Sequence, residues 1–185
     1  MNFAVTPDEI RTTAFGLSGV VYFPRYDAAH NRLSDTTALL LSGVGLPDTE
    51  WFMSRASLSA TDSINVAEWY SNWGTVPKEC HDWLVLGLFA DTTLALAPDT
   101  GTVYALGDGE AQLVYTPIHR DVESLVYALT KFESLCQELE ETDSEDVEER
   151  VDALRAEICE FDPLPFEAED SQWRLAFEEV IDGIW

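Results

Sequence analysis

Basic residues are scarce in this 185-residue chain, which has 10 Lys and Arg against 35 Asp and Glu and a formal net charge of −25 at pH 7. Charged residues make up an ordinary 24% of the chain, so the imbalance comes from missing cations and not from an unusually ionic surface. A field of this sign repels nucleic-acid phosphates and attracts basic surfaces. The composition therefore favours a basic protein as partner, and not nucleic acid.

Cysteines are also few, and long apolar runs are absent. The three cysteines, Cys80, Cys136 and Cys159, are widely spaced and form no CxxC pair, which predicts free thiols in a reducing compartment. The longest apolar run, 83–90, is far shorter than the roughly 20 residues that span a bilayer, and the first residues show no secretory leader pattern. We expect a cytoplasmic protein that neither inserts into a membrane nor carries a cofactor.

Hydrophobic residues are plentiful, at 46% of the chain, with six Trp, six Tyr and nine Phe. A disordered chain needs low hydrophobicity as well as high charge, so this composition predicts a folded core. The length suits one domain spanning residues 1–185.

The first part of the chain predicts short helices. Thr6-Pro7-Asp8-Glu9 has the pattern of a capping box with proline at the first helical position. A β-branched and aromatic run follows at 20–23, and Asp35 is expected to cap a helix that stops at 43–47. This helical start covers about residues 6–47, whereas residues 48–79 show no clear pattern and are expected to be irregular.

From residue 83 to about 116 the pattern is that of strands. Four β-branched or apolar runs are separated by short turn sequences, among them Pro98-Asp99-Thr100-Gly101 and Gly107-Asp108-Gly109-Glu110. Such short connections allow only antiparallel neighbours, so this region predicts an antiparallel meander.

The last third, about residues 121–185, predicts helices. Leu125, Leu129, Phe132, Cys136 and Leu139 lie on one helical face, and the same offsets return from Val147 to Phe161. A third apolar face runs from Trp173 through Phe177 to Ile184. Helices before and after a meander indicate the α+β class.

Short motifs in these elements resemble the SUKH superfamily of bacterial immunity proteins, in the subgroup common in actinobacteria. The motifs are Gly45-Leu46-Pro47 after the opening helix, the strand pair Asp99-Thr100-Gly101-Thr102-Val103-Tyr104, the helix start Val122-Glu123-Ser124-Leu125, and Trp173 in the closing helix.

The resemblance implies a curved antiparallel sheet with helices around it and a non-catalytic role. It implies that the chain binds and neutralises a cognate toxin, often a nuclease or a nucleic-acid deaminase. A toxin of that kind carries a basic groove for phosphates, which an acidic protein could fill. The charge imbalance and the resemblance thus point to the same kind of partner.

Candidate contacts with the toxin are acidic and aromatic residues in loops. Those around the sheet are Asp48, Glu50, Trp73, Asp99, Asp108 and Glu110; those of the acidic segment after the first long helix are Glu140, Glu141, Asp143, Glu145 and Asp146. From Glu133 onward the chain holds 19 acids against three Arg. This segment could imitate a phosphate backbone, or it could simply be a solvated helical surface.

Other readings of the motifs favour structural roles. Asp99-Thr100-Gly101 is also the tripeptide of aspartic proteases, but those enzymes need two such carboxylates and this chain has one copy. Cys80-His81-Asp82 lacks the matched ligand spacing of a zinc site, and 107–110 lacks the Lys of a phosphate loop. Of Trp69, Tyr70 and Trp73, two are expected in the core and one at a contact.

Three alternatives to an immunity protein remain open. One is a scaffold or regulatory module of the same fold that binds several partners. Another is an enzyme using Asp or His, which predicts a concave pocket with converging polar groups. The third is an acidic surface of the halophile type, with no implication for a partner.

Overall fold

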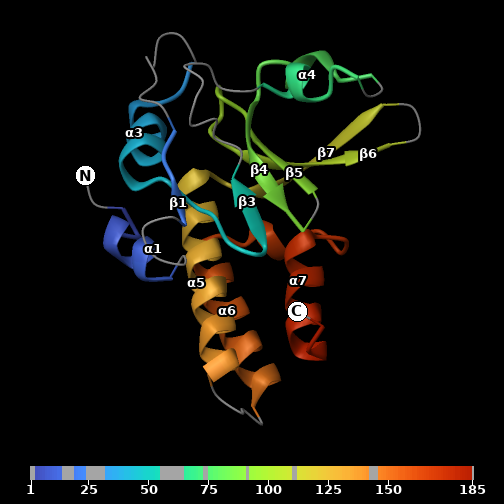
Figure 1. Ribbon diagram of the computed structural model, residues 1–185. Helices are drawn as coiled ribbons and strands as arrows, with labels where there is room; N and C mark the ends of the chain where they lie inside the picture. The colour runs from blue at the N-terminus through green and yellow to red at the C-terminus, as the bar shows by residue number, and fades with distance from the viewer. Residues whose placement is uncertain are drawn as a thin grey trace.

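A computed structural model of the chain contains a five-stranded antiparallel sheet in the order β3-β4-β5-β6-β7 (Figure 1). Its strands are β3 (Phe52–Ser54), β4 (Leu84–Phe89), β5 (Thr92–Leu96), β6 (Val103–Asp108) and β7 (Leu113–His119). The structure describes residues 3–13, 19–23, 32–54, 65–72, 75–90, 92–109, 112–141 and 146–184.

The predicted meander is confirmed, with two differences at its ends. Strand β7 continues through Pro117 to His119, and β3 lies in the stretch that was expected to be irregular. Phe52 of β3 pairs with Phe89 of β4, and both side chains are fully buried. Three residues are too few to show an alternating pattern, so only their pairing with β4 identifies this strand.

The two faces of the sheet are covered by different parts of the chain. One face, which includes Leu86, Leu94 and Leu96, packs into the main core against the helices. The other face, which includes Val85 and Ala95, forms a second apolar cluster. Short helices α4 (Val66–Trp69) and η3 (Lys78–Cys80) cover this second face, so the prediction of an irregular 48–79 is wrong for these segments.

Both outer strands have protected edges. At β7 the Leu113 N–H donates to the Thr75 carbonyl at 3.0 Å, and Pro117, which faces the same side, has no N–H. At β3 the Ser54 N–H donates to the Asp48 carboxylate at 2.9 Å, and the Phe52 carbonyl accepts from the Thr49 N–H at 2.8 Å. These positions of the outer edges are therefore unavailable to another strand.

The helices before the sheet begin largely as expected. Helix α1 (Pro7–Thr13) has the predicted capping box: the Thr6 N–H donates to Glu9 Oε2 at 2.7 Å and the Glu9 N–H to Thr6 Oγ1 at 3.3 Å. Helix α3 (Asp35–Leu39) is capped by Ser34, whose Oγ accepts the Thr37 N–H at 3.1 Å. The assignment of Asp35 as the cap was wrong by one residue; serine and aspartate have nearly equal preference for this position.

A glycine is required where α3 ends. The helix continues as a π-helical turn, η2 (Leu40–Val44), and stops at Gly45, which has a φ of +84°. A β-carbon at Gly45 would lie 3.0 Å from the Val21 carbonyl oxygen. This close approach allows β2 (Leu46–Pro47) to pair with β1 (Val20–Val21) beside the main sheet.

Three helices follow the sheet and lie together below it in Figure 1: α5 (Val122–Glu141), α6 (Val147–Phe161) and α7 (Gln172–Asp182). The predicted apolar face of α5, from Leu125 to Leu139, is buried throughout. The prediction fails for Ile184, which is 71% exposed because α7 ends at Gly183 in the left-handed conformation.

A buried polar chain joins the end of the sheet to these helices. Trp173 Nε1 donates to His119 Nε2 at 2.8 Å, so the other ring nitrogen, Nδ1, carries the proton and donates to Ser124 Oγ at 2.9 Å. Ser124 Oγ in turn donates to Asp162 Oδ2 at 2.5 Å. All four side chains are at most 1% exposed, so the His119–Ser124–Asp162–Trp173 chain is satisfied entirely within the protein.

Burial lowers the pKa of His119 to about 3, although the Asp162 carboxylate acts to raise it. The pKa of a histidine in an unfolded chain is about 6.5. Between these two values the unfolded state binds one more proton than the folded state, so falling pH favours unfolding.

We therefore expect His119 to make the protein sensitive to acid. Its contribution should lower the free energy of unfolding by about 1.4 kcal/mol per pH unit below pH 6, measurable by urea unfolding with tryptophan fluorescence. His119→Gln removes this titration while keeping an acceptor for Trp173, and it should flatten the slope by one proton. Equal slopes for the two proteins would contradict the assignment.

Candidate functional site

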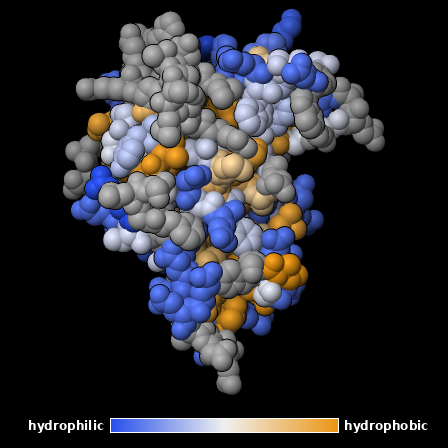
Figure 2. Space-filling view, viewed as in Figure 1, coloured by the Kyte–Doolittle hydropathy of each residue, from blue (hydrophilic) through white to orange (hydrophobic). Residues whose placement is uncertain are grey.

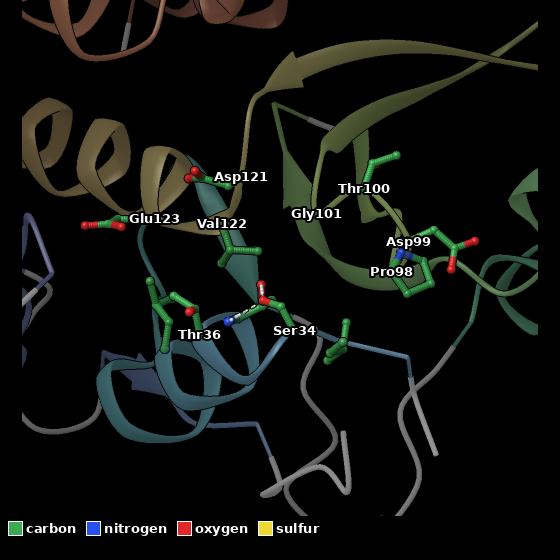
Figure 3. Close-up of a pocket in the computed structure, with 12 residues that line it drawn as sticks. Ser34, Thr36, Pro98, Asp99, Thr100, Gly101, Asp121, Val122 and Glu123 are labelled. Atoms are coloured by element: carbon green, nitrogen blue, oxygen red, sulfur yellow. Dashed lines mark hydrogen bonds between the residues drawn. The ribbon is translucent and has the colours of Figure 1, made fainter. Parts of the chain in front are cut away.

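A pocket of about 220 Å³ lies where the start of α3, the β5–β6 turn and the start of α5 meet (Figure 3). Its apolar lining comes from Leu33, Leu40, Pro98 and Val122. Its polar lining comprises Ser34, Thr36, Thr37, Asp99, Thr100, Asp121 and Glu123.

Most polar groups of this pocket are engaged in caps and turns. Ser34 caps α3, and Asp121 Oδ1 accepts the Ser124 N–H at 2.8 Å at the start of α5. Glu123 Oε1 accepts the Ala4 N–H at 2.6 Å, which ties the N-terminal segment to α5. The carboxylates of Asp99 and Glu123 point away from each other (Figure 3), so the pocket lacks the converging acids that shared-proton chemistry needs.

Asp99 lies in a hairpin turn, as the sequence predicts. Gly101 has a φ of +80°, and its N–H donates to the Ala97 carbonyl at 2.8 Å. The Asp99 carboxylate forms an ion pair with Arg32, which also lies 3.7 Å from Asp82. All three side chains are more than half exposed, so this pairing is weak and open to competition by a partner.

The predicted contact residues do not form one site. Asp99 lies beside the start of α5, whereas Glu140 lies near its end, about 27 Å along the helix axis. Glu50 and Glu140, which belong to the two separate groups of predicted contacts, both raise the pKa of Glu133 in α5. Asp48 accepts a backbone hydrogen bond within the β3 edge.

The remaining predicted residues divide as follows. Glu141 ends α5 and Asp146 is the N-cap of α6. Asp108 ends β6, and its side chain is outside what the structure describes, as are Trp73, Glu110, Asp143 and Glu145 altogether.

Aromatic residues of the described segments 65–72 and 75–83 pack on the sheet. Trp69 and Tyr70 contact the second apolar cluster, as predicted for two of the three aromatics in this stretch. The Tyr70 hydroxyl hydrogen-bonds to Thr93 Oγ1 at 2.9 Å. On the same face of the sheet, the Trp83 ring stacks on the Tyr104 ring with 4.3 Å between their centroids. The rings of Trp83 and Tyr115 pack in a T-shaped arrangement with 5.1 Å between their centroids.

Sequence reasoning missed Glu133, whose side chain is only 5% exposed. Burial raises its pKa, and Glu50 and Glu140 raise it further, while a hydrogen bond from Gln137 lowers it. Glu133 is eight residues after Leu125, one of the spacings that brings a residue onto the same helical face. That spacing was the available signal, although a burial prediction for glutamate runs against its usual preference.

The Cys80-His81-Asp82 segment is structural. Cys80 is fully buried at the end of η3, and burial raises the pKa of its thiol to about 11. The His81 ring hydrogen-bonds to the Val76 carbonyl at 3.1 Å. Within the residues that the structure describes, His, Cys, Asp and Glu side chains form no group suited to a metal ion.

The SUKH-4 immunity protein family model matches residues 11–179. The chain belongs to the SUKH-4 immunity protein family. The SUKH immunity protein family that the motifs predict is thereby confirmed, whereas the actinobacterial subgroup stays a prediction. No curated protein and no solved structure matches the chain.

In the described part of this SUKH-4 protein, exposed apolar side chains are few. In Figure 2 hydrophobic side chains lie in small groups between hydrophilic ones. The large hydrophobic residues that are well exposed in the described part of the chain are Leu39, Met53, Val114, Tyr115, Leu175 and Ile184. Of these, Val114 and Tyr115 are neighbours in β7, and the others are separated along the chain. None of the described helices has the length and hydrophobicity needed to cross a bilayer.

The thiols of this SUKH-4 protein should differ in reactivity. Burial raises the pKa of Cys80 to about 11 and that of Cys136 to about 12, whereas Cys159 is only partly buried. At pH 8 we expect Ellman's reagent to modify Cys159 in the folded protein and Cys80 and Cys136 only after denaturation. Cys159→Ser should abolish the native-state reaction, and rapid labelling of Cys80 in the folded protein would contradict its burial.

Proposed function

We propose that this chain protects its host by binding a cognate basic, nucleic-acid-acting toxin and covering the surface where that toxin binds its substrate. The observation that carries the proposal is the family match, combined with the net charge of −25. The immunity protein role follows from the family, and the class of toxin follows from charge complementarity. Binding alone would neutralise the toxin, in the cytoplasm and without a cofactor.

The structure adds a reason why the acidic charge is available to a partner. Six basic side chains are already paired with acids of the same chain: Arg11, Arg32, Arg120, Lys131, Arg150 and Arg155. Few cations are left to offset the exposed acids on the outer faces of the last two helices, such as Glu148, Glu149, Glu178 and Glu179. Such a surface attracts a basic protein at long range and speeds the encounter.

Two acidic regions could contact the toxin. One region surrounds the pocket and includes the predicted contact Asp99. The other lies near the end of α5 and includes the predicted contacts Glu50 and Glu140. The predicted contacts Asp48, Trp73, Asp108, Glu110, Glu141, Asp143, Glu145 and Asp146 remain proposals. A scaffold that binds several partners is the alternative, which a pull-down yielding many unrelated proteins would favour.

Co-expression tests the protective role directly. The toxin domain encoded beside the gene for this chain should arrest growth when expressed alone, and co-expression of this chain should restore growth. A second, unrelated acidic protein of similar size is the control for non-specific charge effects. Continued growth arrest in the presence of this chain would refute the proposal.

Salt dependence tests the electrostatic part separately. The affinity for a catalytically inactive form of that toxin should fall markedly between about 50 and about 500 mM NaCl. Over this range the electrostatic screening length drops below about 5 Å, so attraction between exposed charges is largely lost. Isothermal titration calorimetry measures the change. Binding that is independent of salt would leave an immunity protein that recognises its toxin without charge complementarity.

A further inference from the structure

Another pocket, of about 110 Å³, lies where β5, β6 and β7 meet the start of α7. Its floor is formed by sheet residues that include Ala105, Gly107 and Val114, and its wall by Ala168 and the beginning of α7. Val114 is 51% exposed, so the pocket opens to solvent. In Figure 1 the β6–β7 hairpin extends beyond α7, so the described helices leave this corner of the sheet uncovered.

The pocket exists because β6 carries small residues on this face. Ala105 and Gly107 alternate with Tyr104 and Leu106, which belong to the apolar cluster on the opposite face. Gly107 pairs with Val114 across the ladder. A β-carbon at Gly107 would lie 3.7 Å from Val114 Cγ2, which is an ordinary contact distance. The floor of the pocket therefore has room for atoms that this chain does not supply.

The fold does not require a glycine at position 107. Its φ is outside the left-handed region, and the bulge of the β6–β7 ladder lies at Val103, at the opposite end of β6. No backbone atom would crowd a β-carbon at this position. A glycine inside a strand weakens it and otherwise marks a bulge, a bend or a point that another molecule approaches closely. Close approach of another molecule is the reason that fits Gly107.

The size of the pocket selects a single side chain as the occupant. Drug-sized ligands occupy pockets of about 300–1,000 Å³, whereas a cavity of about 150 Å³ holds one benzene molecule. At about 110 Å³, this pocket suits one aliphatic side chain. Its apolar surface, which includes Val114 and Leu164, favours such a group over a charged one.

The loop between η4 (Leu164–Phe166) and α7 gives the pocket an acidic rim. The loop contains Glu167, Glu169 and Asp170, which are all exposed, and Asp170 lines the pocket. Among the ion pairs of the described residues, none involves these three acids. A partner that inserts an apolar side chain here is therefore attracted most strongly if basic residues flank that side chain.

The rim is held in place from within the protein. Arg174 Nε donates to the Phe166 carbonyl at 3.1 Å and to the Ala168 carbonyl at 3.0 Å. Ser171 Oγ donates to the Pro165 carbonyl. Because the sheet and the loop are both fixed, the pocket is formed before a partner binds, and little ordering is required on binding.

We infer that this pocket, which we call the Gly107 pocket, receives an aliphatic side chain of the cognate toxin, flanked by basic residues that meet the acidic rim. This inference rests on the proposed function and adds an anchor point to it. An apolar centre within a polar rim is the usual anatomy of a protein interface. The exposed acids supply long-range attraction, and the pocket supplies a fitted contact that distinguishes one basic protein from another.

Filling the pocket tests the inference, with the inactive toxin domain encoded beside this gene as ligand and calorimetry as the readout. Gly107→Ala adds one methyl group that the strand can accommodate, so the midpoint of thermal unfolding should not fall. The methyl group occupies space that the toxin side chain needs, so the affinity should fall at least about tenfold. A lower midpoint would show that the glycine serves the strand and would overturn the inference.

The matched control is Gly43→Ala. Gly43 is exposed and lies outside the pocket, and its β-carbon would lie 3.9 Å from Leu39 Cδ1, so this substitution should leave binding unchanged. Val114→Thr keeps the β-branched shape at an exposed position where folding is not at risk. It places a hydroxyl group in the pocket and should weaken binding as well.

Neutralising the rim tests the flanking charges. Glu169→Gln and Asp170→Asn should each weaken binding up to about fivefold, as expected for exposed charges, and should make it less sensitive to salt. Glu148→Gln is the control, since Glu148 lies at the start of α6, about 20 Å along the helix axis from Phe161. Equal losses for all three variants would show that only the overall charge matters and would contradict an acidic rim.

The outcomes separate the two proposals. If the unsubstituted protein binds the toxin, and Gly107→Ala and Val114→Thr bind it equally well, the inference is wrong and the proposed function stands. If the unsubstituted protein does not bind, both are wrong. Sedimentation of the chain alone tests a second copy as the occupant: a dimer that Gly107→Ala abolishes, with toxin affinity unchanged, would also overturn the inference.

Discussion

The hydrogen-bonded chain from Trp173 through His119 and Ser124 to Asp162 is the interaction on which the arrangement of this protein depends. Its members come from the end of β7, the start of α5, the end of α6 and the start of α7. The Arg120 N–H also donates to Asp162, at 2.8 Å. These groups are buried, and loss of one partner would leave the others unsatisfied. This hydrogen-bonded chain therefore fixes the point at which α5 leaves the sheet. The position of α5 in turn sets the positions of both acidic regions, one beside its first turn and the other near its last turn.

Much of the fold could be predicted from the sequence where local periodicity dominates. The apolar stripe of α5 and the strands from 84 to 119 were recognisable because each carries its own repeat. Strand β3 and the segments 65–72 and 75–83, which cover the second face of the sheet, were not, since their structure depends on contacts with the sheet that no local pattern records. The capping residue of α3 was misplaced by one because Ser34 and Asp35 are both good caps.

The candidate site was harder to predict than the fold, for a similar reason. Asp99 was foreseen as an exposed acid in a turn, but its partner Arg32 is 67 residues away in sequence. Glu50 and Glu140 were predicted in separate groups; Glu140 shares α5 with Glu133, and the packing of Trp51 on Phe132 holds the segment of Glu50 against that helix. Net charge can be counted from a sequence, whereas the ion pair of Asp99 with Arg32 is a property of the folded chain.

The blocked margins of the sheet have a consequence for how recognition can change over time. Thr75 and Asp48 occupy backbone groups of the two outer strands, and Pro117 has no N–H to donate. Pairing with a further strand is therefore disfavoured at these positions, which leaves exposed side chains as the groups that a partner can contact without disturbing the scaffold. Such a fold can adapt to changes in the surface of its partner through single substitutions of exposed side chains, while its own architecture stays the same.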